Sequence, residues 1–273
     1  MGSRTLAIGS VIAHLVAGAT YAQDADEMAR KLQDPLGNIK AIMTDNGVDF
    51  KTGDDETSYT FQIQPVYAIP FEEKGFNFIT RGVFPILGIA PEGQKPVLGE
   101  PLPKGDDHTW GLGDSSLQFF FSPRSESAWK WGAGPVFSLP THSDDKLTGA
   151  GWGAGPILVL VGSLGEDVSL SLIGGHLWGD ESGFSTSIMQ PMLYYNVPGM
   201  EGVSLSYNNT LSYNWNTTSG NEWTIPLGAG VSKTIAMDGG HGLDLGLGLY
   251  YNVERPEGAA DYVLKWSVTV LFP

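Results

Sequence analysis

Polar and charged residues that could select a solute recur at alternate positions in segments whose other positions are apolar. Asp244 stands between two leucines, and Lys265 stands between Leu264 and Trp266. Alternation with a period of two is the pattern of a β-strand with one polar and one apolar face. The polar face collects these candidate residues: Gln62, Gln64, Arg81, Asp114, Gln118, Lys130, Gln190, Asn208, Asp244 and Lys265.

Ionised groups in this set are too costly to bury in a dry core unless they are paired or hydrated. The set therefore fits two structures: a polar lumen that filters solutes by size and charge, or salt-bridged side chains that close a narrow barrel. We expect Arg81 and Lys130 to pair with Asp114, and Lys265 to pair with Asp244.

The apolar faces that oppose these residues are rich in aromatic side chains. The last strand presents Tyr262, Leu264, Trp266, Val268, Val270 and Phe272 on one face. Tryptophans gather near segment ends, as in the interfacial girdles of membrane barrels, namely Trp110, Trp129, Trp178, Trp215 and Trp223. The pattern predicts an all-β fold, a transmembrane antiparallel β-barrel whose apolar face meets lipid.

About twelve strands are expected, an even number that is usual for single-chain bacterial barrels. Their predicted ranges are 41–52, 57–69, 76–87, 111–122, 129–139, 150–162, 167–178, 184–195, 202–216, 222–234, 242–253 and 260–272, and the first has the weakest pattern. With the C-terminus in the periplasm, the long connections 88–110 and 140–149 fall outside the cell, as is typical of such barrels.

The beginning of the chain reads as a cleaved secretory signal over residues 1–22. Arg4 precedes an apolar run from Leu6 to Ala19, and cleavage is predicted after Ala22. The run is shorter than the roughly 20 residues of a membrane span. Export therefore predicts the bacterial outer membrane as the location of residues 41–273.

Between the signal and the barrel, residues 23–40 form an N-terminal helix or periplasmic segment. Ala25, Met28, Ala29 and Leu32 fall near one helical face, and the Pro35-Leu36-Gly37 sequence ends the helix. Two positions are open for this helix, the periplasmic mouth of the barrel or its interior.

Composition excludes some functions. The chain has 30 acidic against 15 basic residues, a net charge of −15, which argues against nucleic acid as a partner. The sequence has no cysteine and therefore no thiolate metal site. The predicted outer loops are acidic and would either hold divalent cations or form a solvated rim, through Asp54, Asp55, Glu56, Asp106, Asp107, Asp144, Asp145, Asp180, Glu181, Glu254 and Glu257.

Catalytic motifs are weak. His142-Ser143-Asp144 has the residue types of a hydrolase triad, but sequence neighbours seldom form one, and no Gly-x-Ser-x-Gly elbow occurs. We expect no catalytic, metal or cofactor site. The alternatives to a channel are a lipid hydrolase or acyltransferase and a closed barrel with a structural or surface-binding role.

An internal repeat marks two neighbouring strands. Trp131–Pro135 and Trp152–Pro156 are both Trp-Gly-Ala-Gly-Pro, and residues 226–230 are a looser echo. Glycine permits close approach of another backbone, and proline inside a strand indicates a β-bulge.

These motifs also carry a family resemblance. The strings are Phe78-Ile-Thr-Arg81, Gly111-Leu-Gly-Asp114, Phe121-Ser-Pro123, both Trp-Gly-Ala-Gly-Pro repeats, Leu139-Pro-Thr141, Gln190-Pro191, Tyr195-Asn-Val197, Trp223-Thr-Ile-Pro226, Tyr250-Tyr-Asn-Val253 and Leu271-Phe-Pro273. Together they resemble the outer-membrane β-barrel family labelled transporter-like or meta-pathway phenol-degradation proteins, sometimes mislabelled neuromedin U. The resemblance implies passive passage of small solutes, hydrophobic or aromatic ones included, in contact with outer-membrane lipid and lipopolysaccharide.

Overall fold

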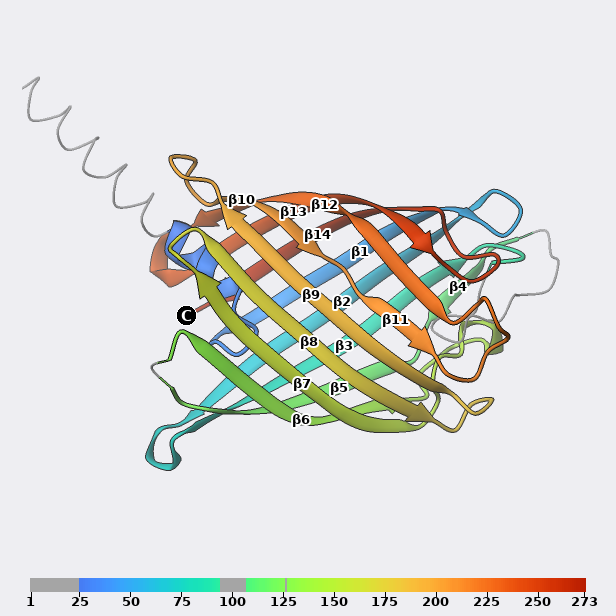
Figure 1. The fold of residues 1–273 in the computed structure, drawn as a ribbon, viewed down its shortest axis with the longest axis horizontal. Coiled ribbons are helices and arrows are strands. Elements are labelled where there is room, and N and C mark those ends of the chain that lie inside the picture. The colour runs from blue at the N-terminus through green and yellow to red at the C-terminus, as the bar shows by residue number, and fades with distance from the viewer. Residues whose placement is uncertain (1–24, 94–106, 126) are drawn as a thin grey trace, which may run out of the picture.

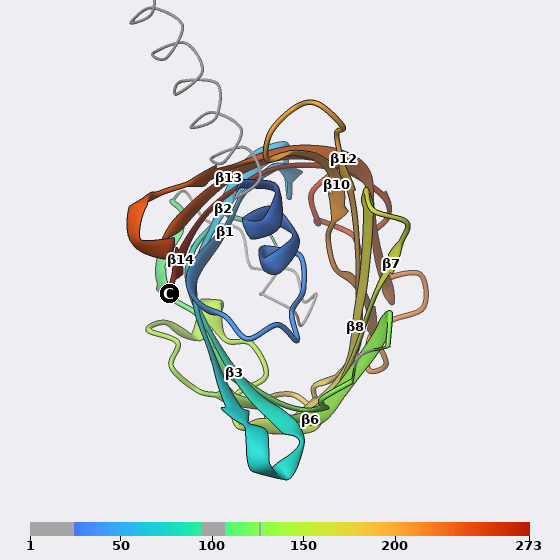
Figure 2. The ribbon, with the colours of Figure 1, turned by 90° about the vertical axis from the view of Figure 1, so that its left-hand side faces the viewer.

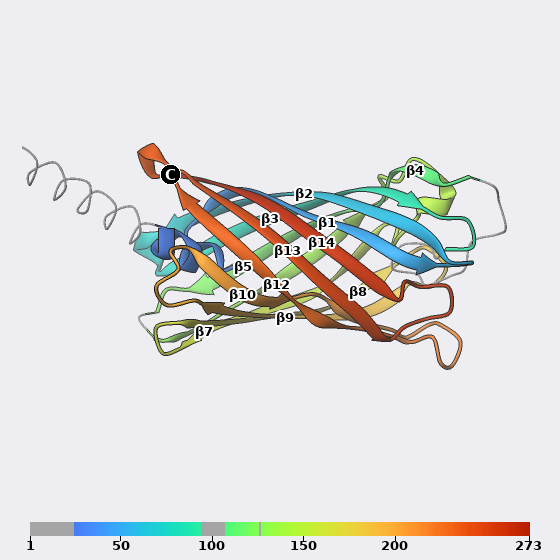
Figure 3. The same ribbon diagram turned by 90° about the horizontal axis from the view of Figure 1, so that it is seen from above.

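Residues 25–93, 107–125 and 127–273 are described by the computed structural model, and they form one closed antiparallel β-barrel. Figures 1 and 3 show the strands running obliquely between two ends of the barrel. We call the end that holds the inner helix and the C-terminus the terminal end, and the opposite one the loop end. The predicted signal peptide, 1–22, lies outside the described residues.

Twelve wall strands are built from fourteen labelled segments. The segments are β1 Lys40–Thr52, β2 Glu56–Phe71, β3 Phe76–Ile89, β4 Thr109–Leu112, β5 Ser115–Pro123, β6 Trp129–Leu139, β7 Gly153–Leu164, β8 Val168–Gly179, β9 Ser185–Asn196, β10 Val203–Asn208, β11 Leu211–Asn214, β12 Trp223–Ala236, β13 Gly242–Glu254 and β14 Tyr262–Phe272. Both β4 and β5 pair with β3, and both β10 and β11 pair with β9 and β12, so each of these pairs is one interrupted strand. The predicted barrel and strand number are confirmed.

The barrel closes because the first strand pairs with the last. Lys40 lies opposite Phe272 and Phe50 opposite Tyr262 in the antiparallel ladder between β1 and β14. Every other strand pairs with its neighbours in sequence, which leaves no open sheet edge in the described wall. Closure satisfies the backbone hydrogen bonds that lipid could not satisfy.

The outer face of the barrel is apolar. Leu205, Leu227, Leu247, Leu249 and Leu158 are each 51–59% exposed, although they lie in the middle parts of strands. Exposed tryptophans lie at strand ends, such as Trp129 at the start of β6 and Trp178 near the end of β8. This pattern is a hydrocarbon-facing belt flanked by aromatic girdles.

A short helix lies inside the terminal end of the barrel. Residues 25–32 are helical in the described chain, and Figure 2 shows the helix within the ring of strands. No helix of the described residues is long and apolar enough to cross a membrane. The predicted helical face is confirmed, because Ala25 and Ala29 are only 5% and 3% exposed. Of the two positions left open for the helix, the structure has the interior.

The helix and the residues up to Ile39 form what we call the inner segment, residues 25–39. Leu36 and Ile39 pack in one apolar cluster with wall residues such as Val66 and Phe120. Gln33 donates a hydrogen bond from Nε2 to Asn196 Oδ1 at 2.8 Å, and its carbonyl accepts one from Ser171 Oγ at 3.1 Å. The inner segment is thus attached to the wall by both apolar and polar contacts.

The Trp-Gly-Ala-Gly-Pro repeat lies on the paired strands β6 and β7, where Pro135 faces Pro156. The bulge predicted at each repeat is wrong: the ladders from β6 to β5 and from β7 to β8 lose pairs there without a register shift. Proline lacks the N–H that the ladder needs, so pairing is interrupted and then resumes in the same register. A bulge does occur beside the looser echo, between Ile225 and Pro226.

We expect Gly134→Ala and Gly155→Ala to destabilise the barrel by about 1–3 kcal/mol each, an overpacking cost. An added Cβ would lie 1.9 Å from the Phe119 carbonyl oxygen at Gly134, and 1.7 Å from the His176 carbonyl oxygen at Gly155. Urea unfolding in lipid vesicles measures the loss. Gly174→Ala is the control, since its Cβ would meet nothing closer than 3.9 Å, and equal stability of all three variants would refute the close-approach role.

Candidate functional site

A cavity lies between the inner segment and the barrel wall. Its floor is apolar, with Leu32 and Ile39 of the inner segment beside the wall residues Val66, Ile79 and Phe120. A polar part of the lining lies beside this floor and comprises Thr44, Asp45, Gln64, Arg81, Gln190, Tyr194, Ser206, Asn208, Ser232, Asp244, Lys265, Ser267 and Thr269. The cavity therefore has two chemically different parts.

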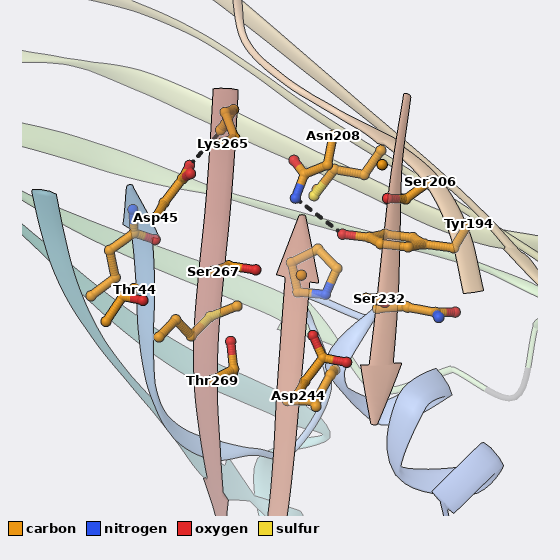
Figure 4. Close-up of a pocket in the computed structure, with 18 of the residues that line it drawn as sticks. Thr44, Asp45, Tyr194, Ser206, Asn208, Ser232, Asp244, Lys265, Ser267 and Thr269 are labelled. Atoms are coloured by element: carbon orange, nitrogen blue, oxygen red, sulfur yellow. Dashed lines mark hydrogen bonds and ion pairs between the residues drawn. The ribbon is translucent and has the colours of Figure 1, made fainter. Parts of the chain in front are cut away.

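An ion pair crosses the β1–β14 junction on the polar side of the cavity. Lys265 Nζ lies 3.0 Å from Asp45 Oδ2, and Figure 4 shows the two side chains turned toward each other. Both side chains are partly exposed, 18% and 32%, so the pair is in contact with the open lumen.

A hydrogen-bonded chain continues along β9 and β10. Gln190 donates from Nε2 to Asn208 Oδ1 at 2.9 Å, and Asn208 donates from Nδ2 to the Tyr194 hydroxyl at 3.2 Å (Figure 4). The Tyr250 hydroxyl accepts from the Asn208 backbone N–H at 3.2 Å. The chain fixes two phenol rings at the lumen surface.

Small residues form the wall beside this chain. The inner faces of β10, β12, β13 and β14 present Ser206, Gly230, Ser232, Gly246, Gly248 and Ser267 to the cavity. Because these side chains are short, the lumen beside this part of the wall stays open.

The predicted lumen residues separate into three places. Arg81, Gln64, Gln190, Asp244 and Lys265 line the cavity. Gln62 and Gln118 adjoin it: Gln62 Oε1 accepts from Gln64 Nε2 at 2.7 Å, and Gln118 lies opposite Arg81 on β5.

Lys130 and Asp114 lie elsewhere, and the ion pairs predicted for the set are wrong. Lys130 pairs with Asp34 of the inner segment at 2.8 Å, near the terminal end. Asp114 pairs with His142 at the loop end. Asp244 does not hold Lys265 but accepts from Thr234 Oγ1 at 2.6 Å. The inner segment and the β1–β14 closure supply partners that strand parity does not reveal.

Three polar residues that line the cavity were not predicted from the sequence, namely Asp45, Tyr194 and Gln33. Asp45 stands on β1, the strand with the weakest pattern, although its parity matches the inward Met43 and Gly47. Tyr194 adjoins Tyr195, so two equal neighbours hide which of them faces inward. Gln33 follows the helix and had no strand parity to place it.

Asp114 anchors the loop over residues 140–152. Its side chain is 4% exposed, and Oδ1 accepts from His142 Nδ1 at 2.6 Å. Oδ2 accepts from the backbone N–H groups of Gly149 at 2.9 Å and Gly151 at 2.8 Å. Burial alone would raise the pKa of Asp114, but together these donors outweigh it and hold the pKa below its ordinary value.

Because the pKa of Asp114 is lower in the folded protein, the anchor stabilises the loop fully at pH values above the ordinary Asp pKa of about 4. This stabilisation is lost as pH falls through the pKa that Asp114 has in the folded protein. At pH 7, Asp114→Asn should accelerate hydrogen exchange of the Gly149 and Gly151 amides roughly 30-fold, for a loss of about 2 kcal/mol. As pH falls through the lowered pKa of Asp114, the difference from wild type should shrink. Asp145→Asn, an exposed position in the same loop, is the control; unchanged exchange in Asp114→Asn would contradict the anchor.

The described His, Ser, Asp and Glu side chains form neither a metal site nor a hydrolase triad at His142-Ser143-Asp144. Among the described residues, no three His, Asp or Glu side chains gather as a metal site. His142, Ser143 and Asp144 face different partners: His142 contacts Asp114, Ser143 Oγ accepts from Leu112 N, and Asp144 accepts from Lys146 N. The residue types of a triad are present without its geometry.

No family model matches the sequence, and no curated protein matches it. The fold is similar to that of the COG4313 outer membrane channel from Pseudomonas putida F1, with 17% identity, a TM-score of 0.59, and coverage of 86% of this chain and 94% of that one. It is also similar to the NanC porin, with 10% identity, a TM-score of 0.52, and coverage of 85% and 99%.

The solved structures just described are a channel and a porin, and they share this barrel architecture. Together with the exposed apolar belt and the closed wall, the likeness confirms the predicted fold of a transmembrane barrel. The chain has the fold of a porin-like barrel of the bacterial outer membrane.

Proposed function

We propose that this chain is a passive channel for small solutes, hydrophobic or aromatic ones included, and that it belongs with the transporter-like, meta-pathway phenol-degradation barrels that its motifs resemble. The observation that carries the proposal is the polar inner face. An ion pair, three glutamines and two phenols line a cavity inside a closed wall.

The inner segment would regulate this passage, because it fills the terminal end of the same lumen. Lys130 with Asp34, and Asn196 with Gln33, hold it by polar contacts that can be exchanged for water. Outer-membrane lipid and lipopolysaccharide would surround the apolar belt. A lipid enzyme is less well supported, since His142 and Asp114 pair but no hydroxyl of a described residue hydrogen-bonds the other His142 nitrogen.

Swelling of proteoliposomes tests the proposal. Vesicles with the reconstituted full chain should admit small neutral solutes, such as benzamide and arabinose, several-fold faster than lipid-only vesicles. Larger sugars should be excluded, because the inner segment lies within the terminal end of the lumen. Swelling at the lipid-only rate for every solute would leave the closed structural barrel as the better account.

A further inference from the structure

Arg81 is a cation of the inner face that has no ion-pair partner among the described residues. The Arg81 side chain projects from β3 into the cavity, where Nη2 donates to Gln64 Oε1 at 2.6 Å. Its Nε is buried and has no hydrogen-bond partner, and no carboxylate of the described residues lies within 4.0 Å of the guanidinium. A guanidinium without a counter-charge is unfavourable in a partly buried site unless another group compensates its charge.

The other basic side chains on the inner face are satisfied. Lys265 pairs with Asp45 at 3.0 Å, and Lys130 pairs with Asp34 at 2.8 Å. Across the ladder from Arg81, Gln118 also keeps a buried Oε1 without a partner. Two buried polar atoms without a hydrogen-bond partner, Arg81 Nε and Gln118 Oε1, thus belong to one cross-strand pair of β3 and β5.

This cross-strand pair lies at the border between the two parts of the cavity. On one side of Arg81 are the amides of Gln64 and Gln62. On the other side are apolar residues of the same inner face: Val66 is the cross-strand partner of Arg81, and Ile79 is paired with Phe120 one row below. A ligand that reaches the guanidinium would therefore lie against an apolar surface.

We propose that Arg81 binds the carboxylate of a small amphipathic monocarboxylic acid, whose apolar body packs on Val66, Ile79 and Phe120; this rests on the proposed channel function. The planar guanidinium matches a carboxylate in a two-bond fork, and no carboxylate of the described residues pairs with it. Asp45 and Asp244 line the same cavity and disfavour ligands with two or more negative charges.

Binding of benzoate to the purified full chain in detergent tests this assignment, with benzamide as the neutral ligand of equal shape and acetate as the acid without an apolar body. Calorimetry should find saturable benzoate binding that is tighter than that of either comparison ligand. Arg81→Gln should weaken benzoate binding at least tenfold and leave benzamide within twofold. Arg81→Lys, which keeps the charge but not the fork, should give an intermediate loss.

Arg124→Gln is the matched control, because Arg124 lies in the turn after β5, pairs with Glu72 at 3.3 Å and does not line the cavity. It should retain wild-type benzoate affinity. Heat-dependent migration in gels verifies that each variant is folded. Equal benzoate affinity in wild type and folded Arg81→Gln would overturn the site, as would a wild type that binds benzamide as tightly as benzoate.

The outcome separates this site from the channel function. If neutral solutes swell the vesicles but benzoate does not bind, the carboxylate site is wrong and the channel stands. If benzoate binds through Arg81 but no solute enters vesicles, the site stands and the channel is wrong.

Discussion

Deletion of residues 25–38 should raise the single-channel conductance of the barrel at least about tenfold, since current through a lumen depends on its narrowest section. The inner segment occupies the terminal end of the lumen, where Ala25, Ala29 and Leu36 are no more than 5% exposed. The deletion keeps Ile39, whose carbonyl oxygen accepts from Ala68 N at 2.9 Å at the start of the wall. Planar-bilayer recording gives the conductance.

The deletion should still form a barrel, because the closing ladder between β1 and β14 begins at Lys40. Glu27→Ala is the control: Glu27 is exposed and pairs at 2.7 Å only with Lys31 of the same helix in the described residues. Its conductance should equal that of wild type. A folded deletion variant with wild-type conductance would mean that the inner segment does not limit the passage.

Leu247→Arg should destabilise the barrel by about 2–4 kcal/mol in lipid vesicles, the cost of an arginine on the lipid face near the middle of the bilayer. Leu247 is the sixth residue of β13, which spans Gly242–Glu254, and it is 54% exposed on the outer face. In a soluble protein, an arginine at such an exposed position would cost little. Unfolding by guanidinium chloride in vesicles measures the difference.

Met237→Arg is the matched control for that variant. Met237 is also apolar and 40% exposed, but it follows the end of β12 and lies in a turn at the terminal end. Depth in the bilayer sets the cost, so the loss there should be about 0–1 kcal/mol. Equal losses at both positions would show that the exposed leucines do not face hydrocarbon.

The wall of the barrel was predictable because period-two alternation depends only on neighbouring positions. β13 and β14 follow their predicted ranges within two residues, and Lys265 faces inward as its parity requires. The interruption between β10 and β11 coincides with a break in that alternation, because Asn209 is a polar residue at the parity of Leu205, Tyr207 and Leu211.

Partners across the lumen were less accessible to sequence reasoning. The Lys265 contact with Asp45 joins the two strands that close the barrel, which lie 220 positions apart in the sequence. The Lys130 contact with Asp34 depends on where the inner segment docks, and short-range patterns contain no information on docking. Pairing predicted from parity alone therefore selected the wrong carboxylates.

The most direct test of the lumen as the passage is a comparison of two adjacent tryptophan substitutions on β14. Ser267 faces the cavity (Figure 4), and Val268 is 37% exposed on the outer face. In the background lacking residues 25–38, Ser267→Trp should reduce single-channel conductance several-fold because the indole occupies the lumen, whereas Val268→Trp should leave it unchanged. Equal currents in the two folded variants would contradict passage through the barrel interior.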